Sequence, residues 1–275
     1  MSDDTSIQVN FGRPMPIFPL DAVTLLPQQV LPLHIFEPRY RQLVDHALDG
    51  SGQIAMAVFE GDDWKQDYHG RPSIRPAVCI GQIIQHEKLM DGRYNLLLQG
   101  ICRARVIEEL PPEDGREYRL ALLEPVGLDP ATQVIIESGG EDDDDDEEPD
   151  QPGLELEPPP DLGLTQTPTP DESETLTGVR ARLSDMLSEG PLTQMAAAEP
   201  ILEYVKNAEI PVGALLELVS FTLISEPSLR YVLLAEPDVE QRAALIMREL
   251  NHLSSLIRRA GEQRPQDWPK GCSWN

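Results

Sequence analysis

The side chains that could bind a metal ion are few in this sequence, and they are scattered. A metal site could be built from His34, His46 and Cys79. Zinc sites use His, Cys and carboxylate ligands, and some of these ligands stand a few residues apart on one local segment. No pair among the three residues shows a spacing of that kind, so the pattern favours packed or surface side chains. We expect no metal and no cofactor.

Glu37 and Arg39 form a second candidate, a catalytic carboxylate beside a guanidinium that could hold an anion. Pro38, which lies between them, favours a structural role for both residues, because proline suits the first position of a helix. Glu37 would then lie at the helix N-terminus, where its side chain can act as a cap and its charge meets the helix dipole. We expect Arg39 to make a structural ion pair.

Sequence motifs of the common catalytic machineries are missing. The chain has no GxxxxGK[ST] phosphate loop, no GxSxG, no HExxH and no paired CxxC. Cys79 and Cys102 fall within predicted strands, where a thiol is buried and unreactive. The sequence therefore predicts no catalytic residue and no enzyme.

Charge limits the kinds of partner. The chain has 22 basic and 48 acidic residues, for a net charge of −26. Such a chain repels phosphate backbones and anionic lipid, so we expect neither nucleic acid nor a membrane as partner. Arg93, Arg103 and Arg105 could form a small basic face, but we expect them to pair internally. Three scattered cysteines, with no signal-peptide pattern and no apolar run of transmembrane length, predict a cytoplasmic protein.

The stretch from Pro27 to Leu48 is the element around which the other segments are expected to be arranged. Val30 to Phe36 is a short apolar run broken by Pro32, which suits a buried and slightly irregular strand. A helix is predicted to begin at Pro38. Its apolar face follows the helical period and consists of Tyr40, Leu43, Val44, Ala47 and Leu48.

Other strands are predicted on both sides of this unit. Met15 to Leu20 contains two prolines, which confine a strand to a sheet edge or a bend. Gln53 to Phe59 is almost entirely apolar and therefore buried. Tyr118 to Val126 is expected to close the sheet.

The strongest β signal is a hairpin centred on Asp91-Gly92. This dipeptide is favoured in type I′ turns, because both central residues need a positive φ. The predicted arms are Ala77 to Lys88 and Arg93 to Ile107. Gly100 marks a bulge or sharp bend in the second arm. About six short strands and one packed helix predict a small, partly closed β-barrel.

The rest of the chain is predicted to be a linker and a helical bundle. Sixteen acidic residues and many prolines lie between positions 137 and 174, which is typical of a disordered linker. Apolar stripes with the helical period follow and favour a compact bundle. We expect five segments: a disordered N-terminus at 1–13, a barrel domain at 14–136, the linker at 137–174, the bundle at 175–262 and a tail at 263–275.

The order of several short motifs resembles the N-terminal, substrate-binding domain of Lon proteases. The motifs are Pro16-Ile17-Phe18-Pro19-Leu20, Leu26-Pro27, Leu31 to Tyr40, Gly81 to Ile84, Asp91 to Leu96 and Gln99 to Arg103. The resemblance implies an α+β fold, with a PUA-like barrel of the Lon N-terminal type followed by a C-terminal helical bundle. Because the phosphate loop and a peptidase domain with its Ser–Lys dyad are missing, we expect a stand-alone protein without the AAA+ motor and the peptidase domain.

By the same resemblance, the expected activity is non-catalytic binding of polypeptide. The bound chain would be an unfolded or client protein, and the protein could act as a protease adaptor. Prolines near the barrel mouth interrupt strand pairing, so an added strand could satisfy free backbone groups there. We expect contact through Phe18, Leu33, His34 and Phe36, although both phenylalanines could instead belong to the core.

One alternative function stays open at this point. An enzyme could hold an unrecognised pocket between barrel and bundle, which a cluster of perturbed titratable groups would indicate. The sequence predicts neither the client nor the oligomeric state.

Overall fold

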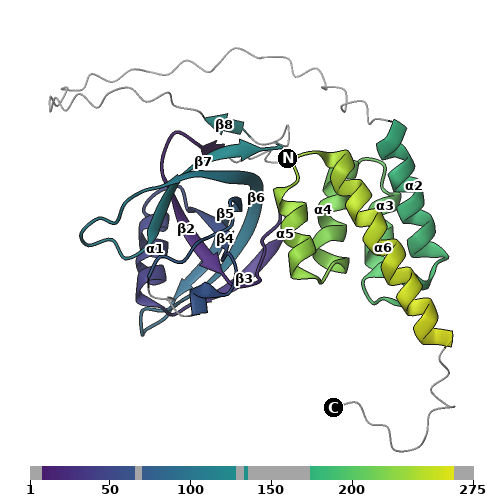
Figure 1. Ribbon diagram of the computed structural model, residues 1–275, viewed down its shortest axis with the longest axis horizontal. Helices are drawn as coiled ribbons and strands as arrows, with labels where there is room; N and C mark the ends of the chain where they lie inside the picture. The colour runs from purple at the N-terminus through teal and green to yellow at the C-terminus, as the bar shows by residue number, and fades with distance from the viewer. Residues whose placement is uncertain (1–7, 66–69, 128–132, 136–173, 263–275) are drawn as a thin grey trace, which may run out of the picture.

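The structure, a computed structural model, describes residues 8–65, 70–127, 133–135 and 174–262 (Figure 1). Its strands are β1 (Gln8–Asn10), β2 (Met15–Leu20), β3 (Val30–Ile35), β4 (Gln53–Val58), β5 (Ala77–Lys88), β6 (Tyr94–Glu109), β7 (Arg119–Val126) and β8 (Gln133–Ile135). Its helices are α1 (Pro38–Leu48), η1 (Asp63–Lys65), α2 (Glu174–Ser188), η2 (Pro191–Gln194), α3 (Ala198–Lys206), α4 (Val212–Leu223), α5 (Pro227–Ala235) and α6 (Val239–Glu262).

The main sheet closes on itself and forms the predicted barrel. Its strand order is β3-β6-β5-β4-β2-β7, and β7 also pairs with β6, so five of the six strands form a ring. The sixth, β3, pairs with the first half of β6 and extends the sheet beyond that ring. The fold is therefore α+β, with helices following the barrel along the chain (Figure 1).

The long strand β6 serves both parts of the sheet because it bends near Gly100. Its first half pairs with β3 and its second half pairs with β7. The register with β5 shifts between Ile80 and Gly81, which places one extra residue of β6 at this point. A Cβ atom on Gly100 would overlap the carbonyl oxygen of Leu26, so the close approach of the two segments requires glycine.

Strand β2 does not lie at a sheet edge, one of the two positions to which its prolines were expected to confine it. It lies between β4, to which it is parallel, and β7, to which it is antiparallel. Each proline removes one backbone donor. Ile17 and Phe18 are buried in the barrel, and we infer that this burial offsets the lost hydrogen bonds. The true edge strand is β3, which contains Pro32 and whose residues are mostly exposed or half-buried.

The predicted hairpin forms between β5 and β6, but its turn is not type I′. The peptide N–H of Leu89 donates to the carbonyl of Arg93, and the N–H of Gly92 donates to the carbonyl of Leu89. Only Gly92 has a positive φ, of 80°, whereas a type I′ turn would also require one at Asp91. The loop is therefore one residue longer than predicted, with a turn closed by a left-handed glycine.

Residues 1–13 were predicted to be disordered, but residues 8–13 of this segment are ordered in the structure. Strand β1 pairs in parallel with β8. Val9 is fully buried and Phe11 is nearly so, because both pack into the barrel core. The predictions for residues 1–7, for the tail at 263–275 and for the linker fall outside the described residues, except that Glu174 begins α2.

Helices α2 to α6 share a hydrophobic core of their own. Its fully buried members include Leu183, Leu192, Leu216, Val219 and Leu250. Leu234 of α5 belongs instead to one of the two core clusters of the barrel, the one that also contains Tyr40 and Leu43 of α1, and Phe221 and Tyr231 pack against this cluster. Helix α5 therefore attaches the helical part to the barrel, and it lies beside the strands in Figure 1.

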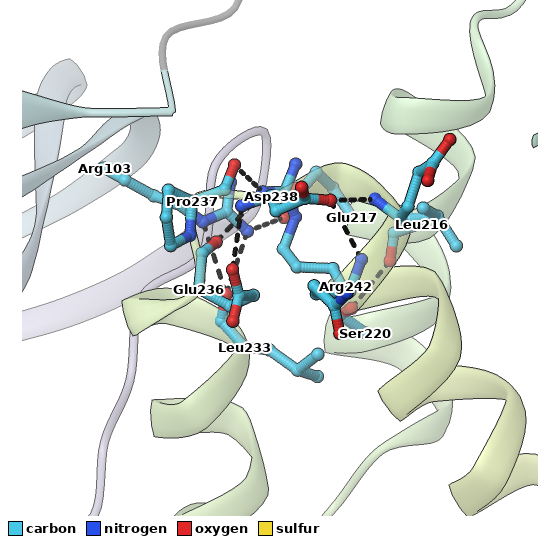
Figure 2. A network of polar contacts seen from close by, with 11 residues as sticks. Arg103, Leu216, Glu217, Ser220, Leu233, Glu236, Pro237, Asp238 and Arg242 are labelled. Atoms are coloured by element: carbon cyan, nitrogen blue, oxygen red, sulfur yellow. Dashed lines mark hydrogen bonds and ion pairs between the residues drawn. The ribbon is translucent and has the colours of Figure 1, made fainter. Parts of the chain in front are cut away.

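A buried ionic network crosses the same junction (Figure 2). Arg103 of β6 donates to the carboxylate of Glu217 in α4 at 2.8 Å, and both side chains are almost fully buried. Arg103 also donates to the carbonyl oxygen of Leu233 at 3.3 Å. Arg242 of α6 lies 3.5 Å from the same carboxylate and donates to the carbonyl of Pro237 at 2.8 Å. Burial and the charge of Arg103 lower the pKa of Arg242.

The three arginines of the possible basic face all pair internally, as expected. Arg93 pairs with Asp91 at 2.6 Å and Arg105 pairs with Glu124 at 3.2 Å, both at the surface. Arg103 is the buried member of the set. No basic face therefore arises from these three side chains.

Candidate functional site

A groove on the outer face of β3, β6 and β5 is the candidate site. Strand alternation directs Val30, Pro32 and His34 away from the core. The register places Gln99, Leu97 and Asn95 of β6 directly opposite these three residues. The groove has a volume of about 420 Å³ and is lined by Pro32, Leu33, His34, Gln85, His86, Glu87, Asn95, Leu96 and Leu97.

Exposed apolar side chains surround this groove. Val30 at the start of β3 is 45% exposed, and Phe36 just after its end is 60% exposed. Ile84 of β5 is 48% exposed, because a register shift makes it the extra residue next to buried Ile83. Met90 lies fully exposed at the hairpin tip. Large apolar side chains gathered at one surface mark a binding surface more often than isolated ones do.

A chain of polar contacts orients the polar end of the groove. His34 Nδ1 lies 2.7 Å from the side-chain oxygen of Asn95. Arg93 lies 3.4 Å from His34 Nε2 and can only donate, so the imidazole fits with its proton on Nδ1. The hydrogen bonds from Arg93 lower the pKa of Asp91, which anchors the guanidinium. The ring of His34 stacks on Phe36 with a centroid distance of 6.4 Å.

The structure brings together three of the four residues predicted to contact peptide. Leu33 and His34 line the groove, and Phe36 extends from its end. Phe36 is therefore not the core residue that the alternative interpretation made it. Phe18 is only 4% exposed and packs edge-on against Tyr40 at 4.4 Å, so its prediction as a surface contact was wrong. Its strand lies inside the sheet, where an apolar residue faces the core.

The comparison with protein families decides what kind of domain carries this groove. The family model for the substrate-binding domain of ATP-dependent protease La (Lon) matches residues 14–252, which includes both the barrel and most of the helices. The chain belongs to this family. The resemblance drawn from short motifs is thereby confirmed, and the match assigns a substrate-binding role in general terms.

Curated relatives of this Lon substrate-binding domain protein are themselves Lon proteases. The Lon protease of Desulfosudis oleivorans is 31% identical over 91 residues, which is 33% of this chain and 11% of the relative. The Lon protease of Desulfovibrio desulfuricans is 26% identical over 193 residues, which is 69% of this chain and 20% of the relative. The chain thus matches at most about a fifth of the length of these two relatives.

A solved structure supports the fold of the Lon-type domain. The N-terminal domain of the Mycobacterium avium complex Lon protease superimposes with a TM-score of 0.55 and 15% identity. The alignment covers 87% of this chain and 98% of the solved domain. At this identity the similarity concerns the fold alone.

Helix α1 positions the end of β3, and hence Phe36, within the Lon-type barrel. Pro38 is its first residue, and Tyr40 and Leu43 are buried in the barrel core. Glu37 is the N-cap residue, but its side chain makes no capping hydrogen bond. Its carboxylate instead accepts from Arg39 at 3.1 Å, so the expected ion pair forms and the expected cap does not.

The residues considered as metal ligands lie in separate parts of the domain. His34 borders the groove, His46 bonds the Tyr118 hydroxyl at 2.8 Å, and Cys79 is fully buried. Across the described ranges, no group of three or more His, Cys, Asp or Glu side chains could hold a metal ion. Burial raises the pKa of Cys79 well above its usual value and that of Cys102 to about 12, so both thiols stay protonated.

A second pocket lies at the junction of barrel and helices, where the alternative hypothesis placed one. It has a volume of about 330 Å³ and is lined by Glu60, Arg75, Pro76, Ala77, Ala104, Arg105, Val126, Tyr231 and Ala235. This lining contains no Ser, Cys, His or Lys, and its one carboxylate, Glu60, is exposed. Burial raises the pKa of Tyr231, so its phenol stays protonated.

Sequence reasoning missed part of each site. Asn95, Leu97 and Gln85 of the groove come from the hairpin arms, whose alternation of polar and apolar residues was visible. That alternation could have identified the outer face, had β3 been recognised as an edge strand. Arg75 and Tyr231 lie in segments far apart along the chain, and no local pattern connects them.

No helix in the described part of the chain is long and apolar enough to cross a membrane.

Proposed function

We propose that this Lon-type domain binds polypeptide along the outer face of β3, β6 and β5. The observation that carries the proposal is the apolar row at the groove, in which exposed Val30 and Phe36 lie on either side of half-buried Leu97. Soluble proteins rarely leave aromatic and branched apolar side chains gathered at one surface without a partner. The substrate-binding role of the family gives that partner a class, namely polypeptide.

An extended segment suits the dimensions of the groove. A strand of six residues such as β3 spans about 20 Å at about 3.3 Å per residue. Alternate side chains of a bound segment would contact the apolar row, and its polar groups would reach His34, Asn95 and Glu87. Pro32 offers no backbone donor, so side-chain contact contributes more to binding than an added ladder of hydrogen bonds.

We further propose unfolded or client proteins as the source of the bound segment, with a protease-adaptor role as the consequence. An unfolded chain exposes the extended apolar stretches that the groove accepts, whereas a folded protein buries them. The net charge of −26 disfavours nucleic acid as a competing partner. Localisation in the cytoplasm stays a prediction.

The test measures binding of a reduced, alkylated and dye-labelled model protein to the full chain by fluorescence anisotropy. Phe36→Asp and Leu97→Asp place a charge in the groove and should each weaken binding about tenfold, since charging an apolar contact costs on the order of 1–3 kcal/mol. Ile107→Asp is the matched control, because Ile107 is 62% exposed and lies outside the groove lining.

The control variant should bind like the unaltered chain. Binding should also change little between low and moderate salt, because apolar contact is screened far less than charge. Equal losses in the control and groove variants, or no loss in the groove variants, would place the binding surface elsewhere.

A further inference from the structure

The junction pocket combines hydrogen-bond donors with small apolar side chains. Tyr231 of α5 carries Arg75 on its ring face, with 4.3 Å from the guanidinium carbon to the ring centroid. The Tyr231 hydroxyl accepts from the N–H of Ala77 at 2.9 Å, so its own proton remains available to donate. Ala77, whose small side chain is buried, adds an apolar contact to the lining.

Arg75 is held in place without being neutralised. Its contact with the Tyr231 ring uses the charge of the guanidinium and none of its N–H donors. Within the described residues, its side chain has neither an ion pair nor a hydrogen-bond acceptor. Arg105, the other cation of the pocket, already pairs with Glu124 at 3.2 Å. A guanidinium that rests on an aromatic ring and keeps its N–H groups available is a suitable partner for a planar anion.

We propose that the junction pocket binds the C-terminal carboxylate of a polypeptide. A carboxylate matches the fork of Arg75 in two parallel hydrogen bonds and accepts a third from the Tyr231 hydroxyl. The last side chain of the peptide then packs on the apolar wall formed by Val126 and Ala235. The site is distinct from the groove, since the two linings share no residue.

Charge and shape select this ligand. Exposed Glu60 lies at the rim and opposes a dianion more strongly than a monoanion, so a carboxylate is favoured over a phosphate. The volume of about 330 Å³ is at the lower limit for small-molecule pockets. A pocket of this size suits the last residue of a chain better than a longer segment.

The experiment uses the full chain and an N-terminally dye-labelled tetrapeptide of small apolar residues in three forms. One form has a free C-terminal carboxylate, one is amidated, and one is amidated with an internal glutamate. Anisotropy should show the free carboxylate form binding about tenfold more tightly than either amidated form, which corresponds to about 1.4 kcal/mol.

Two variants remove the site in different ways. Arg75→Gln removes the charge, and Ala235→Leu fills the pocket without changing any charge. Both should abolish the preference for the carboxylate. Arg248→Gln, at an exposed arginine of α6 outside the pocket, and Phe36→Asp in the groove should preserve it. Circular dichroism melting identifies any variant that fails to fold. If one pocket variant fails to fold, the other still tests the site, because the two substitutions are at different residues.

Three results would overturn the proposal. One is equal binding of the free and amidated peptides to the unaltered chain. Another is a preference that survives in both pocket variants. The third is equal binding of the amidated glutamate peptide, which would show that any carboxylate suffices. Phe36→Asp changes the groove and leaves the junction pocket intact. If the proposed binding at the groove fails its test, the carboxylate preference of the pocket can therefore still be measured.

Discussion

Replacing Glu217 with alanine should destabilise the protein more than any surface substitution. The carboxylate lies between Arg103 and Arg242, and the side chains of the closer pair are only 4% and 6% exposed. Without it, two guanidinium groups stay buried with carbonyl oxygens as their remaining partners. Breaking a buried ion pair from one side costs about 3–5 kcal/mol.

The matched control is Glu124→Ala. Glu124 pairs with Arg105, which lies two positions along β6 from Arg103, but the Arg105–Glu124 pair is about half exposed at 53% and 46%. An exposed pair contributes at most about 1 kcal/mol. Each substitution therefore removes a glutamate carboxylate that pairs with an arginine of β6. The main difference is that one ion pair is buried and the other is exposed.

Thermal unfolding followed by circular dichroism measures both variants. At about 2–4 °C per kcal/mol, Glu217→Ala should lower Tm by roughly 6–20 °C and Glu124→Ala by no more than about 4 °C. Arg103→Met combined with Glu217→Ala should lose less than the sum of the single losses, because the two residues are in contact. Equal shifts for Glu217→Ala and Glu124→Ala would refute the claim that the network holds the helices to the barrel.

Three further outcomes are expected. Leu43→Ala removes a fully buried side chain of α1 and should lower the free energy of unfolding by about 2–5 kcal/mol, measured by urea titration. Gly100→Ala should impair folding, seen as loss of soluble yield or of near-ultraviolet dichroism, because its Cβ would overlap the Leu26 carbonyl. In a Cys272→Ser variant, Cys79 and Cys102 should react with a thiol reagent at pH 8 only after denaturant is added. Both thiols are buried and their pKa values are raised. Rapid reaction of the native protein would contradict their burial.

The part of the fold that local sequence determines was predictable. Helix α1 begins at Pro38 and buries Tyr40, Leu43, Val44 and Ala47, all of which belong to the predicted apolar face. Its start depends on a proline at the first position, and its orientation on the 3.6-residue period. Both signals lie within the segment itself, so no tertiary contact is needed to recognise them.

Strand order was not predictable, because it depends on partners far along the chain. The prolines of β2 predicted an edge strand or a bend and could not distinguish the two, whereas β2 is flanked by β4 and β7. The apolar run of β3 predicted a buried strand, yet only its last residue, Ile35, is buried. This second error matters most for the proposed function, since the exposed face of β3 lines the groove and exposed Phe36 follows the strand.

The junction contacts were beyond sequence reasoning for the same reason. Arg103 and Glu217 are 114 positions apart, and the bond from the Ala77 amide to Tyr231 spans 154 positions. The sequence did predict that the arginines of β6 would pair internally. It could not indicate that one pair would be buried between barrel and helices while another stayed at the surface.

Site-specific photo-crosslinking tests the central claim, polypeptide binding at the groove, most directly. A photoreactive phenylalanine analogue replaces Phe36 in one sample and Tyr204 of α3 in the other; the two aromatic residues are 60% and 52% exposed. After irradiation with an unfolded, labelled model protein, the position of Phe36 should give a crosslinked product and that of Tyr204 should give little. Crosslinking of equal yield at both positions, or a product at Tyr204 alone, would contradict binding at the groove.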